Sequence, residues 1–218
     1  MSAVEKSFLF FQPVIPGLDD IIITEIFADP SPQLGLPDAE FIEIYNRSAN
    51  PFDIASWKIT DGGSTANLST MLLLPGEYLI LSTTSASTQF SSFGKNMGVP
   101  GFPSLNNTAD VLVLKDPSGA TIDSVNYSSA WYRDDEKKDG GWSLELIDPE
   151  NFCAESENWI ASVDGIGGTP GKQNSVFAIN PDVAGPKLLS ATPVNAVLLT
   201  LVFDEKLTNI LPSLSSFG

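Results

Sequence analysis

Short runs in which apolar residues alternate with polar ones dominate this chain, and turn-forming residues separate the runs. A period of two is the spacing of side chains along one face of a β-strand. No window of about a dozen residues keeps the period of an amphipathic helix. We therefore predict an all-β sandwich, because many short strands with frequent turns are typical of that architecture. The predicted strands are Ile21–Phe27, Phe41–Asn46, Trp57–Thr60, Tyr78–Ser82, Asp110–Leu114, Thr121–Tyr127 and Ser143–Leu146.

The residues between these runs indicate tight turns. Residues 116–119 read Asp-Pro-Ser-Gly, which places Asp first, Pro second and Gly fourth, as a type I turn prefers. This turn is expected to join the two strands around it as a hairpin. Trp57, Trp142 and Trp159 each stand beside a strand or a corner, and we expect them to pack in the core, since indole buries a large apolar area.

The charge of the chain excludes several kinds of partner. Asp and Glu number 27 against 11 Lys and Arg, so the formal net charge is −16. Nucleic-acid affinity comes largely from Lys and Arg that neutralise phosphates, so we expect no nucleic-acid binding. No apolar run approaches the roughly 18 residues of a membrane span, and membrane insertion is not expected. Such a negative field attracts cations, including Ca²⁺.

The residue types that most often carry catalysis are scarce. There is no histidine, which removes the usual base of a nucleophilic triad, and Cys153 is the one cysteine. A zinc site is excluded for the same reason, since only carboxylates remain as ligands. Residues 165–173 invite a phosphate-loop interpretation, but Ile166 replaces the first glycine and Gln173 replaces the required Ser or Thr. We expect a tight turn there, no cofactor and no catalytic residue.

One pair of carboxylates has the spacing for chemistry. Strand periodicity places Glu25 on one face with Ile23 and Phe27. It likewise places Glu43 on one face with Phe41 and Tyr45. If the two strands are neighbours, the two glutamates approach each other and form a carboxylate pair. Such a pair can bind a hard cation or act as acid and base.

The other interpretation of the same pair is structural. The glutamates then belong to a polar outer face, where they meet Lys58, Arg47 or water. Paired residues on adjacent strands serve either role, so the pattern does not decide between them.

Acidic and amide side chains also gather in loops, where they suggest calcium. The candidate Ca²⁺ ligands are Asp134, Asp135 and Asp139. No cluster has EF-hand spacing, and Ca²⁺ needs six to eight oxygens that the fold must bring together. The alternative is a solvated acidic loop. Further clusters are Asp29, Asp38 and Glu40, and Asn106, Asn107 and Asp110.

Four segments carry a resemblance to a known family. They read IIITEIFADP from Ile21, AEFIEIYNRS from Ala39, FDIASWKITD from Phe52 and GGTPGKQNS from Gly167. In this order they resemble the lamin tail domain, an immunoglobulin-like β-sandwich, in the form found in secreted bacterial proteins. The resemblance covers about residues 20–175, and GGTPGKQNS is similar to the closing corner of that fold.

The resemblance implies a function without naming a ligand. It suggests a non-catalytic binding, attachment or spacer module of an exported multidomain bacterial protein, located outside the cell or on its surface. The partner would be a protein or a surface polymer. The alternative is a carboxylate- and metal-dependent hydrolase that uses Glu25, Glu43 and the loop 134–139, or an accessory domain of a secreted hydrolase or nuclease.

The two ends of the chain differ from its middle. Residues 1–19 are expected to be an N-terminal extension, too short in its apolar part for a signal peptide, so any export signal is removed or absent from this sequence. Residues 176–186 are expected to be a linker. Residues 187–218 resemble the truncated start of a second, bacterial immunoglobulin-like domain, with strands at 187–192 and 196–203. We expect those strands to dock on the sandwich edge or to exchange with a second copy as a dimer.

Overall fold

The computed structural model describes residues 14–151, 154–183, 185–203, 205 and 207. Cys153 and residues 1–13 of the N-terminal extension lie outside this part of the chain. Within it, the strands are β1 (Ile21–Phe27), β2 (Phe41–Asn46), β3 (Phe52–Asp53), β4 (Lys58–Thr60), β5 (Thr65–Asn67), β6 (Leu72–Leu73), β7 (Tyr78–Thr83), β8 (Asn96–Val99), β9 (Ala109–Lys115), β10 (Thr121–Ser128), β11 (Leu144–Leu146), β12 (Trp159–Ala161), β13 (Leu188–Asn195) and β14 (Leu198–Phe203).

The helical elements of the described residues are all short 3-10 turns. They are η1 (Ser87–Phe90), η2 (Ser129–Tyr132), η3 (Lys137–Asp139) and η4 (Glu155–Asn158). None of the helices in these residues is long and apolar enough to cross a membrane.

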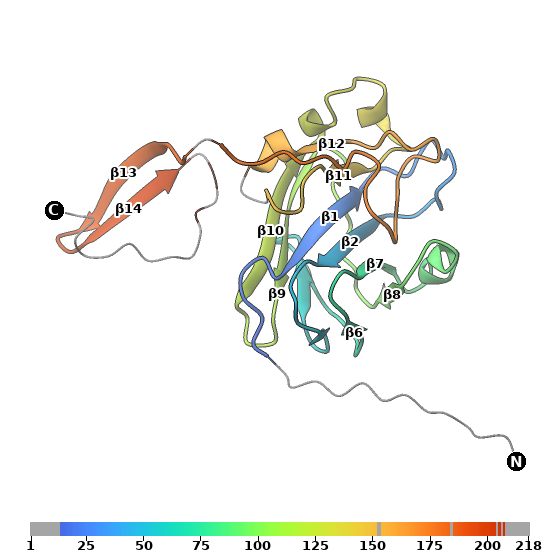
Figure 1. Ribbon diagram of the computed structural model, residues 1–218, viewed down its shortest axis with the longest axis horizontal. Coiled ribbons are helices and arrows are strands. Elements are labelled where there is room, and N and C mark those ends of the chain that lie inside the picture. Colours follow the sequence, from blue (N-terminus) through green and yellow to red (C-terminus); the bar gives the residue numbers. More distant parts are fainter. Residues whose placement is uncertain (1–13, 152–153, 184, 204, 206, 208–218) are drawn as a thin grey trace, which may run out of the picture.

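Two sheets pack face to face and confirm the predicted β-sandwich (Figure 1). One sheet has six strands in the order β12-β11-β1-β2-β7-β8, and the other has four in the order β10-β9-β4-β5. Neighbouring strands are antiparallel except β7 and β8, which are parallel. The short strands β3 and β6 pair separately.

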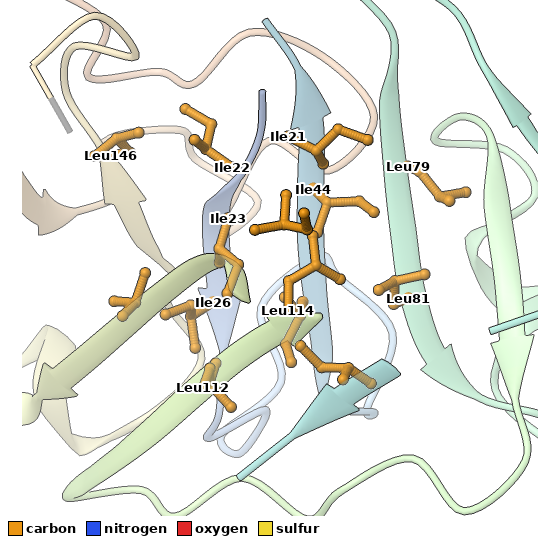
Figure 2. Close-up of a cluster of buried hydrophobic side chains, with 14 of the residues drawn as sticks. Ile21, Ile22, Ile23, Ile26, Ile44, Leu79, Leu81, Leu112, Leu114 and Leu146 are labelled. Carbon is orange, nitrogen blue, oxygen red and sulfur yellow. The ribbon is translucent and has the colours of Figure 1, made fainter. Parts of the chain in front are cut away.

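Alternate residues of the strands fill the space between the two sheets. Ile44 lies opposite Leu79 on β7, and both are fully buried. Figure 2 shows these side chains in one apolar cluster with Leu112 and Leu114 of β9. This packing explains the period of two in the sequence, because only one face of each strand enters this core.

The opposite face of the six-stranded sheet is buried as well. Phe27, Phe41 and Ile80 lie there in a second apolar cluster, together with Leu36 from a loop and Phe90 from η1. As a consequence every residue of β1 is buried. A sheet buried on both faces leaves no solvated side on which a charged side chain of β1 can lie.

A β-bulge corrects one predicted detail of β1. Ile23 lies opposite Ile44 but Glu25 lies opposite Glu43, so the register shifts between Ile23 and Glu25. Thr24 is the extra residue, and it places Ile23 and Glu25 on opposite faces rather than on the shared face that strict alternation predicts. The prediction that Glu25 shares a face with Phe27 is confirmed, because Phe27 lies opposite Phe41.

The predicted turn and core tryptophans are present. Residues 116–119 connect β9 and β10, with a hydrogen bond of 3.0 Å from the Gly119 N–H to the Asp116 carbonyl. Gly119 has a φ of 92°, a conformation that favours glycine. Trp57 and Trp159 are buried, and Trp142 packs against the same core with part of its ring exposed.

Strands β13 and β14 form a hairpin that extends from the sandwich (Figure 1). Within the described part of the chain these strands pair only with each other, so the prediction that they dock on the sandwich edge is wrong. Nearly every residue of the two strands is exposed.

The segment expected to be a linker begins on the sandwich instead. The N–H of Ala178 donates to the Ile147 carbonyl at 3.2 Å, and the N–H of Asn180 donates to the Asp148 carboxylate at 2.8 Å. The side chain of Asn151 donates to the Asn180 carbonyl at 2.6 Å. Residues 176–180 are therefore held against the turn that follows β11.

Candidate functional site

Three glutamates lie side by side on neighbouring strands of the six-stranded sheet. Glu25 of β1 is opposite Glu43 of β2 on one side and opposite Glu145 of β11 on the other. Their side chains are all 0% exposed. The predicted approach of Glu25 and Glu43 is confirmed by this register, and the sequence analysis missed Glu145 as the third member. We call these residues the glutamate cluster.

A segment that follows β12 in the chain closes over the glutamate cluster. We call residues 167–176 the closing segment. Thr169 holds two glutamates, because its N–H donates to Glu25 Oε1 and its hydroxyl donates to Glu145 Oε1, each at 2.8 Å. The Gly171 N–H donates to Glu43 Oε2 at 2.5 Å. Ser175 Oγ donates to Glu145 Oε2 at 2.7 Å, so every glutamate binds this segment.

The strands themselves supply the remaining donors. The Thr24 hydroxyl, which the bulge in β1 positions, donates to Glu43 Oε1 at 2.9 Å. The Ser143 hydroxyl donates to Glu25 Oε1 at 2.5 Å. Carboxylates that accept several such bonds are partly compensated for the loss of water.

Two further residues fix the closing segment at close range. The Asn174 side chain donates to the Thr24 carbonyl at 2.8 Å and to the Leu146 carbonyl at 2.9 Å, joining β1 to β11. Gly168 approaches so closely that a Cβ atom there would lie 2.5 Å from Glu25 Oε1. This contact explains why glycine precedes Thr169 in the closing corner.

Burial governs the protonation of the glutamate cluster. Burial is the main cause that raises the pKa of Glu25 well above its usual range, and the charges of Glu43 and Glu145 raise it further. Burial also raises the pKa of Glu43 to about 8, against the opposing effect of the bonds from Gly171 and Thr24. Glu43 therefore holds a proton near neutral pH, and Glu25 keeps its proton to a higher pH than an ordinary glutamate does.

One carboxyl oxygen of the glutamate cluster is left without a hydrogen-bond partner. Among the described residues Glu25 Oε2 has no such partner, while every other carboxylate oxygen of the glutamate cluster accepts at least one bond. Glu25 is also the central member, with a carboxyl group on each side. A proton bound to Glu25 therefore reduces its repulsion with both neighbours.

The expectation of a polar outer face with basic partners is wrong for this pair. No lysine or arginine in the described residues hydrogen-bonds to the three glutamates, and Arg47 pairs instead with Glu150 at 2.6 Å. The reason is the closing segment, which covers the face that strand periodicity alone leaves open to water. The cluster is a buried set of carboxyl groups whose oxygens, except Glu25 Oε2, accept hydrogen bonds from the chain itself.

The candidate calcium ligands do not gather around one point. Asp134 Oδ1 accepts from the backbone N–H groups of Glu136 and Lys137, and these bonds lower its pKa. Asp135 pairs with Lys138 at 2.5 Å, and Asp139 ends η3. Residues 14–151, 154–183 and 185–203 contain no group of three His, Cys, Asp or Glu side chains that could hold a metal ion. A calcium site in this loop stays a prediction.

A surface hollow of about 640 Å³ lies beside the glutamate cluster on the same sheet. Tyr45 of β2 and Tyr78 of β7 line one side. Another side is lined by Gln173, Phe177, Ile179, Pro181 and Asp182. The turn 148–150 completes the hollow. Sequence analysis missed this site, because residues that line it come from four separate parts of the chain.

A comparison with protein families identifies most of the sandwich. The model of the family described as Lamin Tail Domain matches residues 16–129, more than half of the chain. That range contains Glu25 and Glu43 but not Glu145 or the closing segment. No curated protein matches the chain.

Proposed function

Because this chain belongs to the lamin tail domain family, we propose that it is a non-catalytic binding and attachment module of an exported multidomain bacterial protein. Its place is outside the cell or on the cell surface, and its partner is a protein or a surface polymer. The family match gives the fold, and the burial of the glutamate cluster supports the absence of catalysis. Fold alone does not assign a function.

The complete burial of Glu25 and Glu43 beneath the closing segment is the observation that carries this proposal. A general acid or base must reach the atom whose proton it moves, directly or through one water. Both side chains are 0% exposed. The donors that they bind belong to the chain itself, with the Gly171 N–H on Glu43 and the Thr169 N–H on Glu25. Neither carboxyl group is open to a substrate.

The alternative, a metal-dependent hydrolase, requires the acidic loop and the glutamates to act together. None of the hydrogen-bond partners of the three glutamates comes from residues 134–139. Asp134 and Asp135 already serve the turn and the pair with Lys138. These bonds support a structural role for the loop.

Charge supports a partner other than nucleic acid. The formal net charge of −16 repels a phosphate backbone, because binding to nucleic acid depends on Lys and Arg contacts to phosphates. We therefore propose that the module binds no nucleic acid and does not insert into a membrane.

Turnover measurements test the proposal. The full chain is assayed on phosphoester and glycoside substrates with added Ca²⁺, Mg²⁺ or Zn²⁺, beside a Glu43→Gln variant and a Glu157→Gln control that changes an exposed carboxylate outside the acidic loop and the glutamate cluster. We expect no turnover from any of the three proteins. Metal-dependent turnover that Glu43→Gln abolishes and Glu157→Gln retains would overturn the proposal and establish the hydrolase.

A further inference from the structure

The hollow beside the glutamate cluster has an aromatic wall. The rings of Tyr45 and Tyr78 stack with their centroids 4.5 Å apart and an interplanar angle of 27°. Both side chains are partly exposed, and Phe177 across the hollow is 43% exposed. Burial raises the pKa of Tyr78 above its usual range, so this ring stays a neutral phenol. The wall therefore offers uncharged aromatic surface.

The charged groups around that wall are acidic. Asp148, Glu150 and Asp182 line the hollow, and none of the residues that line it is basic. The Glu150 side chain is 72% exposed although it pairs with Arg47. Asp148 is buried and accepts backbone N–H groups from Glu150 and Asn180, so the chain holds its carboxyl group in place beneath the surface. Three carboxyl side chains thus line the hollow, and one of them, that of Glu150, pairs with the guanidinium group of Arg47.

The residues that line the hollow lie on elements that the fold holds in place. Tyr45 and Tyr78 lie opposite each other on paired strands, and Tyr45 is two residues from the anchored Glu43. The other wall follows directly from the closing segment, which the glutamate cluster binds. Binding sites held on rigid elements lose little free energy to ordering when a ligand enters.

From these observations we infer that the hollow binds lysine or arginine side chains of a cationic peptide segment on a partner protein. Cations are attracted to aromatic ring faces, and the attraction strengthens as water is excluded. Neighbouring carboxylates add complementary charge, and the net charge of −16 speeds the approach of a basic partner. The inference rests on the proposed binding function and names the chemistry of its partner.

The volume of the hollow fits this use. About 640 Å³ is within the range of sites that take small ligands or a few side chains. A hollow of this kind also suits a neutral proline-rich segment, since aromatic grooves bind such peptides. The carboxylates favour the cationic segment, because a neutral peptide makes no use of them.

A short fluorescent oligo-arginine peptide is the probe, and a matched oligo-citrulline peptide, which keeps the planar group and loses the charge, is its control. Binding to the full chain is measured by fluorescence anisotropy, and the site is mapped by amide chemical shifts. We expect oligo-arginine to bind and to shift the resonances of Tyr45, Tyr78 and Phe177. Oligo-citrulline is expected to bind much more weakly.

Variants separate the hollow from general charge attraction. Tyr78→Leu should weaken oligo-arginine binding about three- to tenfold, while Tyr78→Phe, which keeps the ring, should not. Glu150→Gln and Asp182→Asn should each weaken binding about two- to fivefold. Glu136→Gln removes the same charge from an exposed site away from the hollow and should have little effect. Thermal melts confirm that each variant folds.

Three results would contradict the inference. An equal loss of oligo-arginine affinity in Glu136→Gln and Glu150→Gln would show charge attraction alone and would overturn the inference. Equal binding of oligo-citrulline would do the same, as would a proline-rich peptide that shifts these resonances where oligo-arginine does not. Each of these results concerns the partner chemistry, whereas failure of the proposed function itself is read from the turnover assay.

Discussion

The Cα atoms of Glu25 and Glu43 face each other across β1 and β2, and neither side chain reaches solvent. Two carboxyl groups in that position cannot both be ionised without a large loss of solvation and strong repulsion. The protein therefore carries protons as part of its folded structure. Those protons connect the stability of the sandwich to pH.

Stability should fall as the solution becomes alkaline. The pKa of Glu25 and the pKa of Glu43 are raised in the folded protein, the latter to about 8 from an ordinary value near 4.5. Above about pH 4.5 the folded state then binds more protons than the unfolded state. The free energy of unfolding that these protons contribute is therefore fully present below that pH and is lost as the pH rises toward 8. The slope is at most about 1.4 kcal/mol per pH unit for each extra proton.

Urea unfolding between pH 5 and pH 9 measures this dependence. Glu43→Gln should flatten the curve, because an amide in this place never ionises. Glu136→Gln, an exposed change, should leave the curve parallel to that of the unmodified chain. Parallel curves for all three proteins would contradict the assignment of the protons to the glutamate cluster.

Thr169→Val should destabilise the fold by about 1–3 kcal/mol. The change keeps the shape and the backbone bond to Glu25 but removes the hydroxyl that donates to Glu145 Oε1 at 2.8 Å. A buried carboxylate oxygen then loses its partner, and that loss costs more than an ordinary hydrogen bond contributes. Thr65→Val on the exposed side of β5 is the matched control and should change stability by less than about 0.5 kcal/mol. Equal effects on the urea midpoint would refute the role of Thr169.

Gly168→Ala should destabilise the protein, whereas Gly165→Ala should not. A Cβ atom at Gly168 would lie 2.5 Å from Glu25 Oε1 and 2.7 Å from Ser143 Oγ, and one at Gly165 would meet nothing within 4 Å. Overpacking of this kind costs about 1–3 kcal/mol. The measurement is the melting temperature of the two variants. A Gly168→Ala variant as stable as the unmodified chain would mean that the closing segment moves freely over the glutamates.

The exposed hairpin should cause self-association. Leu199 is 54% exposed and Leu201 is 42% exposed on the same face of β14. Apolar strands with open edges tend to pair with another chain, so we expect a dimer through residues 187–218. Leu199→Lys with Leu201→Lys should yield a monomer in light scattering. Thr192→Lys with Thr200→Lys adds the same charge at polar positions and should leave the dimer intact. A monomer for the unmodified chain would refute this expectation.

Much of this fold could be predicted from local sequence. The bounds of β1 and β2 agree with the predicted strands Ile21–Phe27 and Phe41–Asn46, because both runs are rich in β-branched and aromatic residues and are followed by turn-forming residues. Strands such as β3 and β6 were missed, since two residues carry no measurable period. The bulge at Thr24 was also missed, because every residue of β1 is buried and its sequence shows no clear alternation that an extra residue would interrupt.

The glutamate cluster could be predicted only in part. Period-two spacing was enough to pair Glu25 with Glu43, and Glu145 carried the same local signal, a glutamate within an apolar strand. What the sequence lacked was the order β11-β1-β2, which joins strands more than a hundred residues apart. Thr169 and Gly171 were recognised as a corner, but their donors meet the carboxylates only through tertiary packing.

The attachment of residues 169–180 to the sheet has a mechanical consequence. The hairpin leads out from this stretch, so a pull on the C-terminal side would load its hydrogen bonds one after another. The bonds of Asn180 and Ala178 would yield first, then those of Ser175 and Asn174, and those of Gly171 and Thr169 last. The domain would thus lengthen by detachment of residues 169–180 from the sheet before any strand of the sandwich unfolds.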